Sequence, residues 1–338
     1  MRPESRSAEK RLLQNADHPG GSLHSPLVPS FPLDMPNLNI VTGAFGYSGS
    51  YITRLLLERS DHVRSLTAHP VRPNPFGNAV ETAPFNFDRP EALAQSLAGV
   101  DTVFNTYWIR LPHHAMTFER AIANVKTLID AAKRAGVRRF VHISITNASP
   151  DSPLPYFRGK GIVEKALADS GLSYAILRPA HLFGGDDEIL TNNIAWLLRK
   201  FPFFAIPGDG SYRLQPIHVG DLARIAIDAA DGDRNVTLDA VGPETYTFND
   251  FVGVIKRTLA ARARIVHVSP AIAFLLVSTI GRFTRDVVLT RDEIRGLMAT
   301  LLVSNGPTTA PTRFSDWLAH NAHSVGIRYV SELARRSG

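Results

Sequence analysis

The turn after the first strand-like segment constrains the fold of this chain more than any other feature. In "NIVTGAFGYSGSYI" (residues 39–52), an apolar run leads directly into Gly43, Gly46 and Gly49, and a second apolar run follows. Glycine destabilises regular secondary structure, so three glycines at this junction indicate a backbone that must stay free of side chains. In a dinucleotide-binding fold, that freedom lets a pyrophosphate approach the amides at a helix N-terminus.

The three glycines have different predicted tasks. We expect Gly43 to make the tight turn, Gly46 to let the pyrophosphate approach, and Gly49 to let the helix pack closely on the strand. A glycine triplet alone is weak evidence. Here it follows the first strand, opens a helix and starts an alternating series, and that context favours nucleotide binding over a merely tight turn.

Alternating strands and helices predict the architecture. Strands are expected near residues 38–42, 62–67, 80–86, 101–107, 138–145, 173–178 and 214–218. Helices are expected over 48–59, 90–98, 115–135, 158–170, 187–200 and 219–230. Such alternation predicts an α/β fold with a doubly wound, parallel Rossmann sheet and right-handed crossovers.

The same reading divides the chain into three parts. Residues 1–34 are rich in Pro, Gly and Ser and lack periodicity, so we expect a disordered, dispensable extension, with Met35 as the physiological start. Residues 35–240 are the expected NAD(P)-binding Rossmann domain. After about residue 241 the alternation breaks, and residues 241–338, with part of 185–210, are expected to form a smaller, mostly helical lobe for substrate or partner.

Composition excludes several classes of protein. The 338 residues are 44% hydrophobic and 20% charged, with no cysteine, which excludes disulfides, thiolate nucleophiles and Cys-ligated zinc and fits a cytoplasmic location. The net charge of +6 is scattered, so it favours an anionic ligand over a nucleic acid. Adjacent His113 and His114 cannot share one helical face, and no metal site is expected.

The most apolar segment is too short to cross a membrane. "AIAFLLVSTIG" (residues 271–281) falls well below the ~20 residues that a transmembrane helix needs. We expect a buried helix there; the alternative is a helix that docks on a membrane surface or on a partner.

Further motifs carry a resemblance to a known family. "FNFDRPEAL" contains Asp88, the helix expected over 115–135 contains Asn124, and "YFRGK" contains Tyr156 and Lys160 in a YxxxK pattern; "LRPAHLFG" (177–184) and "PIHVGDLA" (216–223) add two more. With these, residues 38–250 resemble the extended and atypical short-chain dehydrogenase/reductase superfamily. The segments "NTYW", "HPVRPNPFG" and "PYFRGK" look most like the atypical branch, which includes NmrA-like sensors, triphenylmethane-reductase-like enzymes and a nucleotide-binding accessory subunit of respiratory complex I.

The resemblance implies an NAD(P) site at the carboxyl edge of the sheet. The residues that it assigns to the cofactor are Gly43, Phe45, Gly46, Tyr47, Gly49, His69, Arg72, Phe87, Asp88, Thr106, Tyr107, Asn124, Ser144, Tyr156, Lys160, Pro179, Ala180 and Leu182. An NAD site usually carries an acid at the end of strand two. Here that strand ends "SLTAHPVR", with His69 and Arg72 just beyond, so NADP(H) is preferred over NAD(H).

The resemblance also implies catalytic residues. Tyr156 and Lys160 lie at i and i+4, where a lysine would lower the pKa of the phenol and hold the nicotinamide ribose. The usual Ser or Thr position falls on Ile145. Its neighbour Ser144 is the remaining candidate, either catalytic, in contact with the cofactor, or supporting the strand end.

Five other polar or aromatic positions have two interpretations each. Tyr107 and Trp108 either wall an apolar substrate pocket or pack in the core. His181 is expected to be structural rather than to face the pocket, and His218 with Asp221 is expected to fix a strand-to-helix turn.

Two functions remain open from the sequence. The first is an NAD(P)H-dependent oxidoreductase for a small apolar carbonyl or quinone-like compound, favoured by Tyr156 and Lys160. The second is a non-catalytic redox sensor or accessory subunit, favoured by Ile145. A nucleotide-sugar epimerase or dehydratase is a further alternative. The expected partners are a small-molecule substrate and either a homo-oligomer or a larger redox complex.

Overall fold

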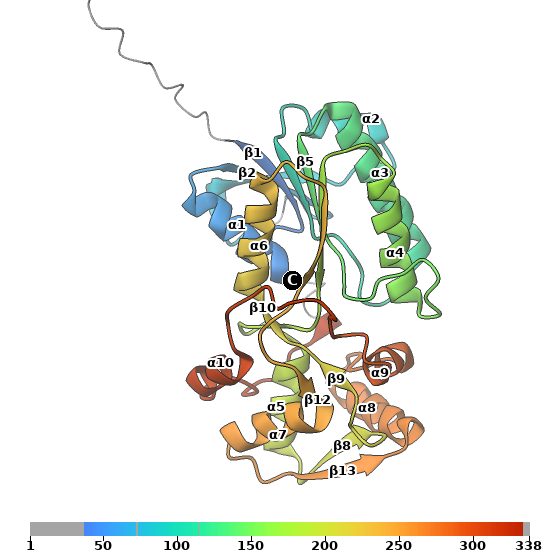
Figure 1. Cartoon of the computed structure of the whole chain (residues 1–338), viewed down its shortest axis with the longest axis vertical. Helices are drawn as coiled ribbons and strands as arrows, with labels where there is room; N and C mark the ends of the chain where they lie inside the picture. The colour runs from blue at the N-terminus through green and yellow to red at the C-terminus, as the bar shows by residue number, and fades with distance from the viewer. Residues whose placement is uncertain (1–36, 72–73, 114, 334–338) are drawn as a thin grey trace, which may run out of the picture. The chain divides into compact units, whose positions relative to one another are not determined.

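A seven-stranded parallel sheet forms the centre of the part of the chain that is described, residues 37–71, 74–113 and 115–333 of a computed structural model (Figure 1). The strand order is β11-β6-β5-β4-β1-β2-β3. The strands are β1 (Leu38–Thr42), β2 (His62–Thr67), β3 (Val80–Pro84), β4 (Thr102–Asn105), β5 (Arg139–Ile143), β6 (Tyr174–Pro179) and β11 (Val236–Ala240). The prediction of a doubly wound Rossmann sheet is confirmed.

The first strand lies at the point where the strand order reverses. β1 pairs in parallel with β2 on one side and with β4 on the other, with Asn39 opposite both Val63 and Thr102. The strands that follow β1 in sequence therefore lie first on one side of it (β2 and β3) and then on the other (β4, β5 and β6). A crevice at the carboxyl ends of β1 and β4 is where ligands bind in open sheets of this kind.

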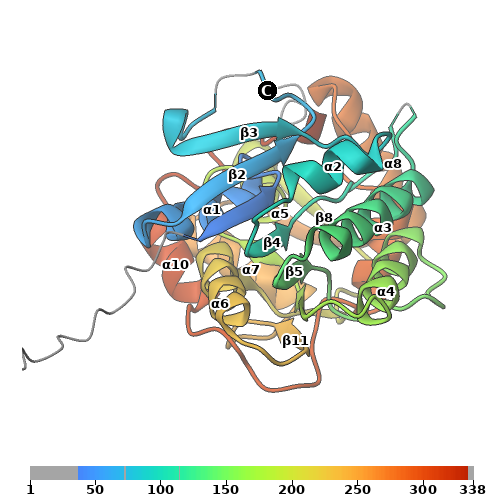
Figure 2. The same cartoon turned by 90° about the horizontal axis from the view of Figure 1, so that it is seen from above.

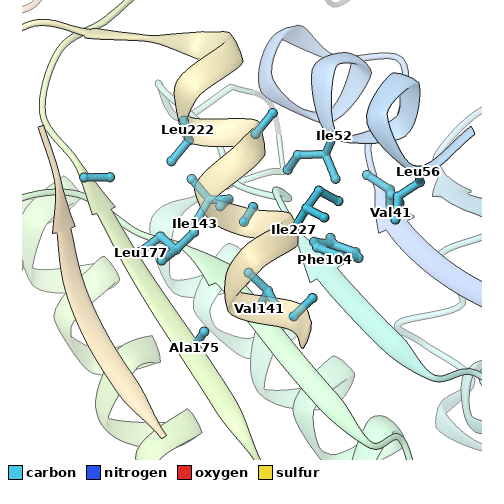
Figure 3. Close-up of a cluster of buried hydrophobic side chains, with 14 of the residues drawn as sticks. Val41, Ile52, Leu56, Phe104, Val141, Ile143, Ala175, Leu177, Leu222 and Ile227 are labelled. Carbon is cyan, nitrogen blue, oxygen red and sulfur yellow. The ribbon is translucent and has the colours of Figure 1, made fainter. Parts of the chain in front are cut away.

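Helices cover both faces of the sheet, as the view from above shows (Figure 2). One face carries α1 (Tyr47–Glu58) and α6 (Val219–Asp231); the other carries α2 (Pro90–Ser96), α3 (Phe118–Ala135) and α4 (Pro155–Ala168). Figure 3 shows the core under α1 and α6, where Ile52 and Ile227 meet the strand residues Val41, Phe104 and Val141.

The predicted helix ends follow from capping. In α3, the Thr117 hydroxyl accepts a hydrogen bond from the Arg120 amide, and Gly136 ends the helix with φ of 70°. In α6, the His218 ring accepts from the Gly220 amide, and Asp221 accepts from the Thr312 amide and from Arg224. The prediction that this pair fixes the turn is thus confirmed for His218, whereas Asp221 ties α6 to the segment at Thr312.

A second group of elements packs beyond the carboxyl edge of the sheet. Its members are β7 (Leu182–Phe183), α5 (Leu190–Lys200), β8 (Phe203–Pro207), β9 (Arg213–Leu214), β10 (Ile217–His218), β12 (Tyr246–Thr247), α7 (Phe248–Thr258), β13 (Arg264–Val268), α8 (Pro270–Thr284), α9 (Arg291–Met298) and α10 (Phe314–Asn321). A core that includes Phe183, Phe204, Phe251 and Phe314 holds these elements together. Within the described residues they add three two-stranded sheets, β10-β7, β12-β9 and β13-β8. The described residues belong to one compact unit, Pro36–Gly338, and the predictions for residues 1–34 lie outside them.

The predicted strand at 214–218 is wrong. β9 pairs with β12 and β10 pairs with β7, so one predicted strand is two short strands in different sheets. Pro216 lies between them and has no amide to donate, which interrupts any continuous ladder. The sequence did not predict β7, β8, β11 and β12, because β7 and β12 have two residues each and β8 and β11 are edge strands, which carry little periodic signal.

The segment 271–281 is not the buried helix that its composition predicts. It lies in α8, all of which is described, and only Ala273 and Gly281 of that helix are buried. Leu275 is 65% exposed and Phe283 is 86% exposed. Apolar side chains project from all sides of α8, but β8 and α9, which pack against it, cover only part of its surface. In the described chain, no helix combines the length and apolarity that crossing a membrane requires.

Candidate functional site

The glycine turn has the geometry of a phosphate-binding loop. Gly43 has φ of +72°, a conformation that favours glycine, and Gly46 begins α1 without a side-chain cap. A Cβ on Gly49 would lie 2.1 Å from the Gly43 carbonyl oxygen, whereas a Cβ on Gly46 would lie 3.2 Å from that atom. Gly49 therefore allows the helix to pack on the strand, and the exposed Gly46 leaves the helix N-terminus open.

A buried polar network fixes the ends of β1 and β4 beside this turn. The Thr42 hydroxyl donates to Asn105 Oδ1 (2.9 Å) and accepts from the amides of Thr106 and Tyr107 (2.9 Å each). Asn105 Nδ2 lies 3.0 Å from His142 Nδ1, and burial holds the pKa of His142 well below its usual value. The sequence reading missed this network because Asn105 and His142 are ordinary strand residues until the register places them together.

Aromatic rings line the sheet edge next to the turn. Phe87 stacks on Phe85 with centroids 4.8 Å apart, and both pack 5.1 Å from Tyr107. The Tyr107 hydroxyl accepts a hydrogen bond from Asn124 Nδ2 at 2.8 Å. Of the predicted cofactor residues, Phe87, Tyr107 and Asn124 therefore lie together.

The remaining residues predicted for the adenosine end are more dispersed. Phe45 contacts the loop after β2 through Phe76, with ring centroids 6.3 Å apart. His69 and Asp88 are exposed, and Arg72 lies outside the described residues.

Tyr156 and Lys160 lie on α4 with an indole against both. Trp108 packs edge-on against Tyr156, with centroids 6.2 Å apart, and Lys160 Nζ lies 4.7 Å from the centre of the Trp108 ring. Lys160 also donates to the Ile143 carbonyl at 2.6 Å and is buried. Trp108, whose role was open, thus contacts both members of the YxxxK pair.

Electrostatics contradict one expectation from the motif. Burial raises the pKa of Tyr156 well above its usual value, the carboxylate of Glu293 raises it further, and Arg110 only partly offsets this. Burial also lowers the pKa of Lys160 to about 7, partly offset by Glu164. Lys160 therefore does not lower the phenol pKa, because a buried amine is itself disfavoured in the charged form.

The buried lysine predicts a pH-dependent stability. Its pKa is about 7 in the folded chain and near its ordinary value when unfolded, so the unfolded chain holds more protons above pH 7. The destabilisation by Lys160 is complete below pH 7 and shrinks as the pH rises. We expect the free energy of unfolding of Lys160→Met, relative to wild type, to be highest at neutral pH and to fall towards pH 10. Urea melts across that range test this; a constant difference would show that Lys160 does not titrate there.

Ser144 does not face the substrate side. Its hydroxyl donates to the buried carboxylate of Glu164, which also pairs with Arg178, whose Nε lies 3.0 Å from Glu164 Oε1. The neighbouring Ile145 instead lines the large cavity described next. The catalytic interpretation of Ser144 is therefore wrong. Neighbouring residues of a strand point to opposite sides, so Ser144 points away from the cavity that Ile145 lines, and its hydroxyl supports the end of β5.

A cavity of about 910 Å³ lies between the carboxyl edge of the sheet and the second group of elements. Tyr156, Trp108 and Ile145 line one side of it, and Ala273 and Val277 of α8 line another. Its other apolar lining includes Leu111, Phe118, Leu154, Phe157, Leu182, Ile189, Ile194, Leu197, Val288, Leu289, Ile294 and Leu302.

Charged side chains gather at one part of the cavity wall. Arg110 Nε donates to Glu293 at 2.6 Å and Nη2 to the Val288 carbonyl at 3.0 Å, and Glu332 Oε2 lies 3.8 Å from Nη1. Among the described residues, the buried Nη1 has no hydrogen-bond partner. No sequence signal connects Arg110 with Glu293, because they come together only when the second group of elements folds back.

A buried acid and histidine occupy another part of the wall. Burial raises the pKa of Glu188 to about 7, although its carboxylate accepts from the amides of Leu190 and Thr191 at the start of α5. His181 lies 3.2 Å from the Thr191 hydroxyl, and burial lowers its pKa to about 3. His181 is therefore neutral. It bonds to Thr191 as a structural histidine would, and it also lines the cavity, so the structural and the pocket-facing interpretations are compatible.

The predicted site residues thus fall into two groups. The glycine turn, Thr106, Phe87, Tyr107 and Asn124 lie at the β1–β4 edge, while Tyr156, Ala180 and Leu182 line the cavity. Tyr47 belongs to both, since it follows Gly46 and lines the cavity, and its hydroxyl donates to the Gly184 carbonyl at 2.8 Å. Pro179 ends β6, where its carbonyl accepts from the Thr146 amide.

Comparison with known proteins agrees with the turn geometry. Residues 43–196 match the family model described as NAD(P)H-binding. This chain contains an NAD(P)H-binding domain. The relatives named below and the shared fold are consistent with the resemblance to the atypical short-chain dehydrogenase/reductase branch.

Three proteins to which this chain is similar have different names and roles. NADH dehydrogenase (ubiquinone) 1 alpha subcomplex subunit 9 from mitochondria of Arabidopsis thaliana is 24% identical over 78% of this chain and 70% of its own length. The NAD(P)H azoreductase of Xenophilus azovorans is 25% identical over 68% of this chain and 77% of its own. The structure of an NADPH-dependent quinone oxidoreductase from Escherichia coli superimposes with a TM-score of 0.68 at 19% identity, covering 84% of this chain and 98% of that one.

Proposed function

We propose that this protein is an NAD(P)H-dependent oxidoreductase that reduces a small, apolar, oxygen-bearing substrate such as a quinone. One observation carries the proposal: Tyr156 lies on the wall of a large, mostly apolar cavity next to the dinucleotide-binding edge. A sugar nucleotide would need a more polar lining, which makes an epimerase a weaker candidate.

The chain's own residues suit a bound dinucleotide. The uncapped N-terminus of α1 and the exposed Gly46 would receive the pyrophosphate, and the aromatic rings near Tyr107 would flank the adjoining part of the cofactor. When bound, the reduced nicotinamide supplies the hydride. We further propose NADP(H) over NAD(H), because no acid ends β2 and His69 with Arg72 would accommodate a 2′-phosphate.

Tyr156 is the proposed proton donor. The raised pKa keeps its hydroxyl protonated at neutral pH, and the edge contacts of Trp108 and Phe118 restrict the ring. Lys160 then has a supporting role. It donates to the Ile143 carbonyl at the end of β5 and contacts the Trp108 ring, and it does not lower the pKa of the phenol.

Arg110 is the proposed ligand of the substrate oxygen. Its Nη1 is buried at the cavity wall and makes no hydrogen bond to the described residues, with Glu332 Oε2 at ion-pair distance (3.8 Å); a buried unsatisfied donor costs about 1–3 kcal/mol. A carbonyl oxygen of an apolar substrate would provide that acceptor, while the ring fills the apolar part of the cavity.

The experiment is a turnover assay with both nicotinamides. Purified protein is mixed with NADPH or NADH and with a panel of quinones, azo compounds and aldehydes, and the absorbance of the reduced nicotinamide is followed. We expect oxidation of NADPH by an apolar quinone, with NADH less effective. Tight binding of NADPH with no oxidation by any acceptor would contradict an enzymatic function.

That outcome would support the second candidate, a non-catalytic sensor or accessory subunit. Two observations favour it: Ile145 stands at the usual Ser or Thr position, and Trp108 packs against Lys160, where the family motif implies contact with the ribose. The Arabidopsis relative, named as a subunit of NADH dehydrogenase, is consistent with such a role.

A further inference from the structure

The outer face of α8 carries an apolar stripe that no described element covers. Ile272, Leu275, Leu276, Thr279 and Phe283 are exposed, at spacings of three or four residues that place them along one side of a helix. Figure 1 shows α8 at the periphery of the elements beyond the sheet. A surface helix normally turns such a stripe towards the core, so this orientation indicates a partner.

The charges around the stripe identify the chemistry of that partner. Between residues 269 and 291, all of which are described, Arg282, Arg285 and Arg291 are exposed, and the one acid, Asp286, is buried. Asp286 accepts hydrogen bonds from the Tyr329 hydroxyl and the Glu332 amide, so it does not face the stripe. The exposed charged side chains of this segment are therefore all cationic, and they lie among exposed apolar ones.

The opposite face of α8 lines the cavity. Ala273 and Val277, which lie four residues apart, belong to the cavity wall, while Leu275 and Phe283 point outwards. One helix thus separates the apolar cavity from the apolar, cationic outer surface. A bilayer seated on that surface would lie one helix away from the cavity.

We propose that α8 docks this protein on an anionic lipid membrane. Leu275, Leu276 and Phe283 enter the boundary between headgroups and acyl chains, and Arg282 and Arg285 contact lipid phosphates. Anionic lipid satisfies both parts of the surface at once, whereas a second copy of α8 would bring the arginines of both chains together. This inference does not depend on the proposed reaction.

Flotation with vesicles tests the proposal without any measurement of turnover. The full chain is incubated with vesicles of phosphatidylcholine alone or of phosphatidylcholine with phosphatidylglycerol, at low and high salt. We expect flotation with the anionic vesicles, weakened by salt. Phe283→Ser and Leu275→Ser should each reduce partitioning about tenfold or more, and Arg282→Glu should reduce it at least about fivefold.

Matched controls lie at the amino edge of the sheet. Val236→Ser changes an exposed apolar residue at the start of β11 and Arg234→Glu an exposed basic residue just before it, and both variants should float like wild type. Because Phe283 and Leu275 are exposed, their variants should keep the wild-type melting temperature. The proposal is overturned if the full chain floats with neither vesicle, if the α8 variants float unchanged, or if Phe283→Ser instead abolishes self-association of the vesicle-free protein.

Discussion

Gly46→Val should abolish tight NADPH binding while leaving the fold intact. The two methyl groups would project from the N-terminus of α1 into the space where the pyrophosphate approaches the backbone. Loss of a single charge-assisted hydrogen bond costs about 1.5–3 kcal/mol, which corresponds to a dissociation constant roughly tenfold to hundredfold larger. A fluorescence titration with NADPH measures this loss.

Two glycine variants separate binding from stability. Gly306→Val is the control for crowding: its Cβ would lie 3.3 Å from the Ser304 hydroxyl, close to the 3.2 Å at Gly46. Gly306 does not line the cavity, so this variant should bind NADPH with wild-type affinity. Gly49→Ala forces a Cβ against the Gly43 carbonyl and should lower the free energy of unfolding by about 1–3 kcal/mol. Wild-type affinity in Gly46→Val would mean that this glycine serves only the turn.

The features that the sequence predicts correctly are those with local causes. The glycine turn and the two ends of helix α3 depend on residues within a few positions of each other: Thr117 caps the Arg120 amide, and Gly136 bonds to the carbonyls of Ala132 and Lys133. Alternation of strands and helices leads to a parallel sheet because crossover connections have one handedness. The central sheet and the cofactor edge were therefore predictable.

The features that the sequence does not predict depend on contacts between distant segments. Ser144 resembles a catalytic candidate until Glu164 and Arg178 occupy its hydroxyl, and Arg110 acquires a role only beside Glu293. The exposure of α8 is of the same kind, because composition gives its apolarity but not which faces its neighbours cover. The environment of Ser144 depends on how α4 and β6 pack beside β5, whereas those of Arg110 and α8 depend on how the second group of elements packs.

Tyr156→Phe should reduce turnover strongly and leave cofactor affinity nearly unchanged. The substitution removes only the hydroxyl, so the ring contacts with Trp108, Phe118 and Phe157 persist. A positioned general acid contributes about 10²–10⁴-fold in rate. Because no other phenol among the described residues lies at the family's catalytic position, we expect a loss of that size in quinone reduction.

The most direct test of the account is the single-turnover rate of NADPH oxidation by an apolar quinone in wild type and in Tyr156→Phe. Both proteins are first saturated with NADPH and then mixed rapidly with the quinone, so that binding does not limit the rate. The account predicts rapid oxidation by wild type and a rate about 10²–10⁴-fold lower in the variant, at the same dissociation constant for NADPH. Equal rates in the two proteins, or no oxidation by wild type, would contradict it.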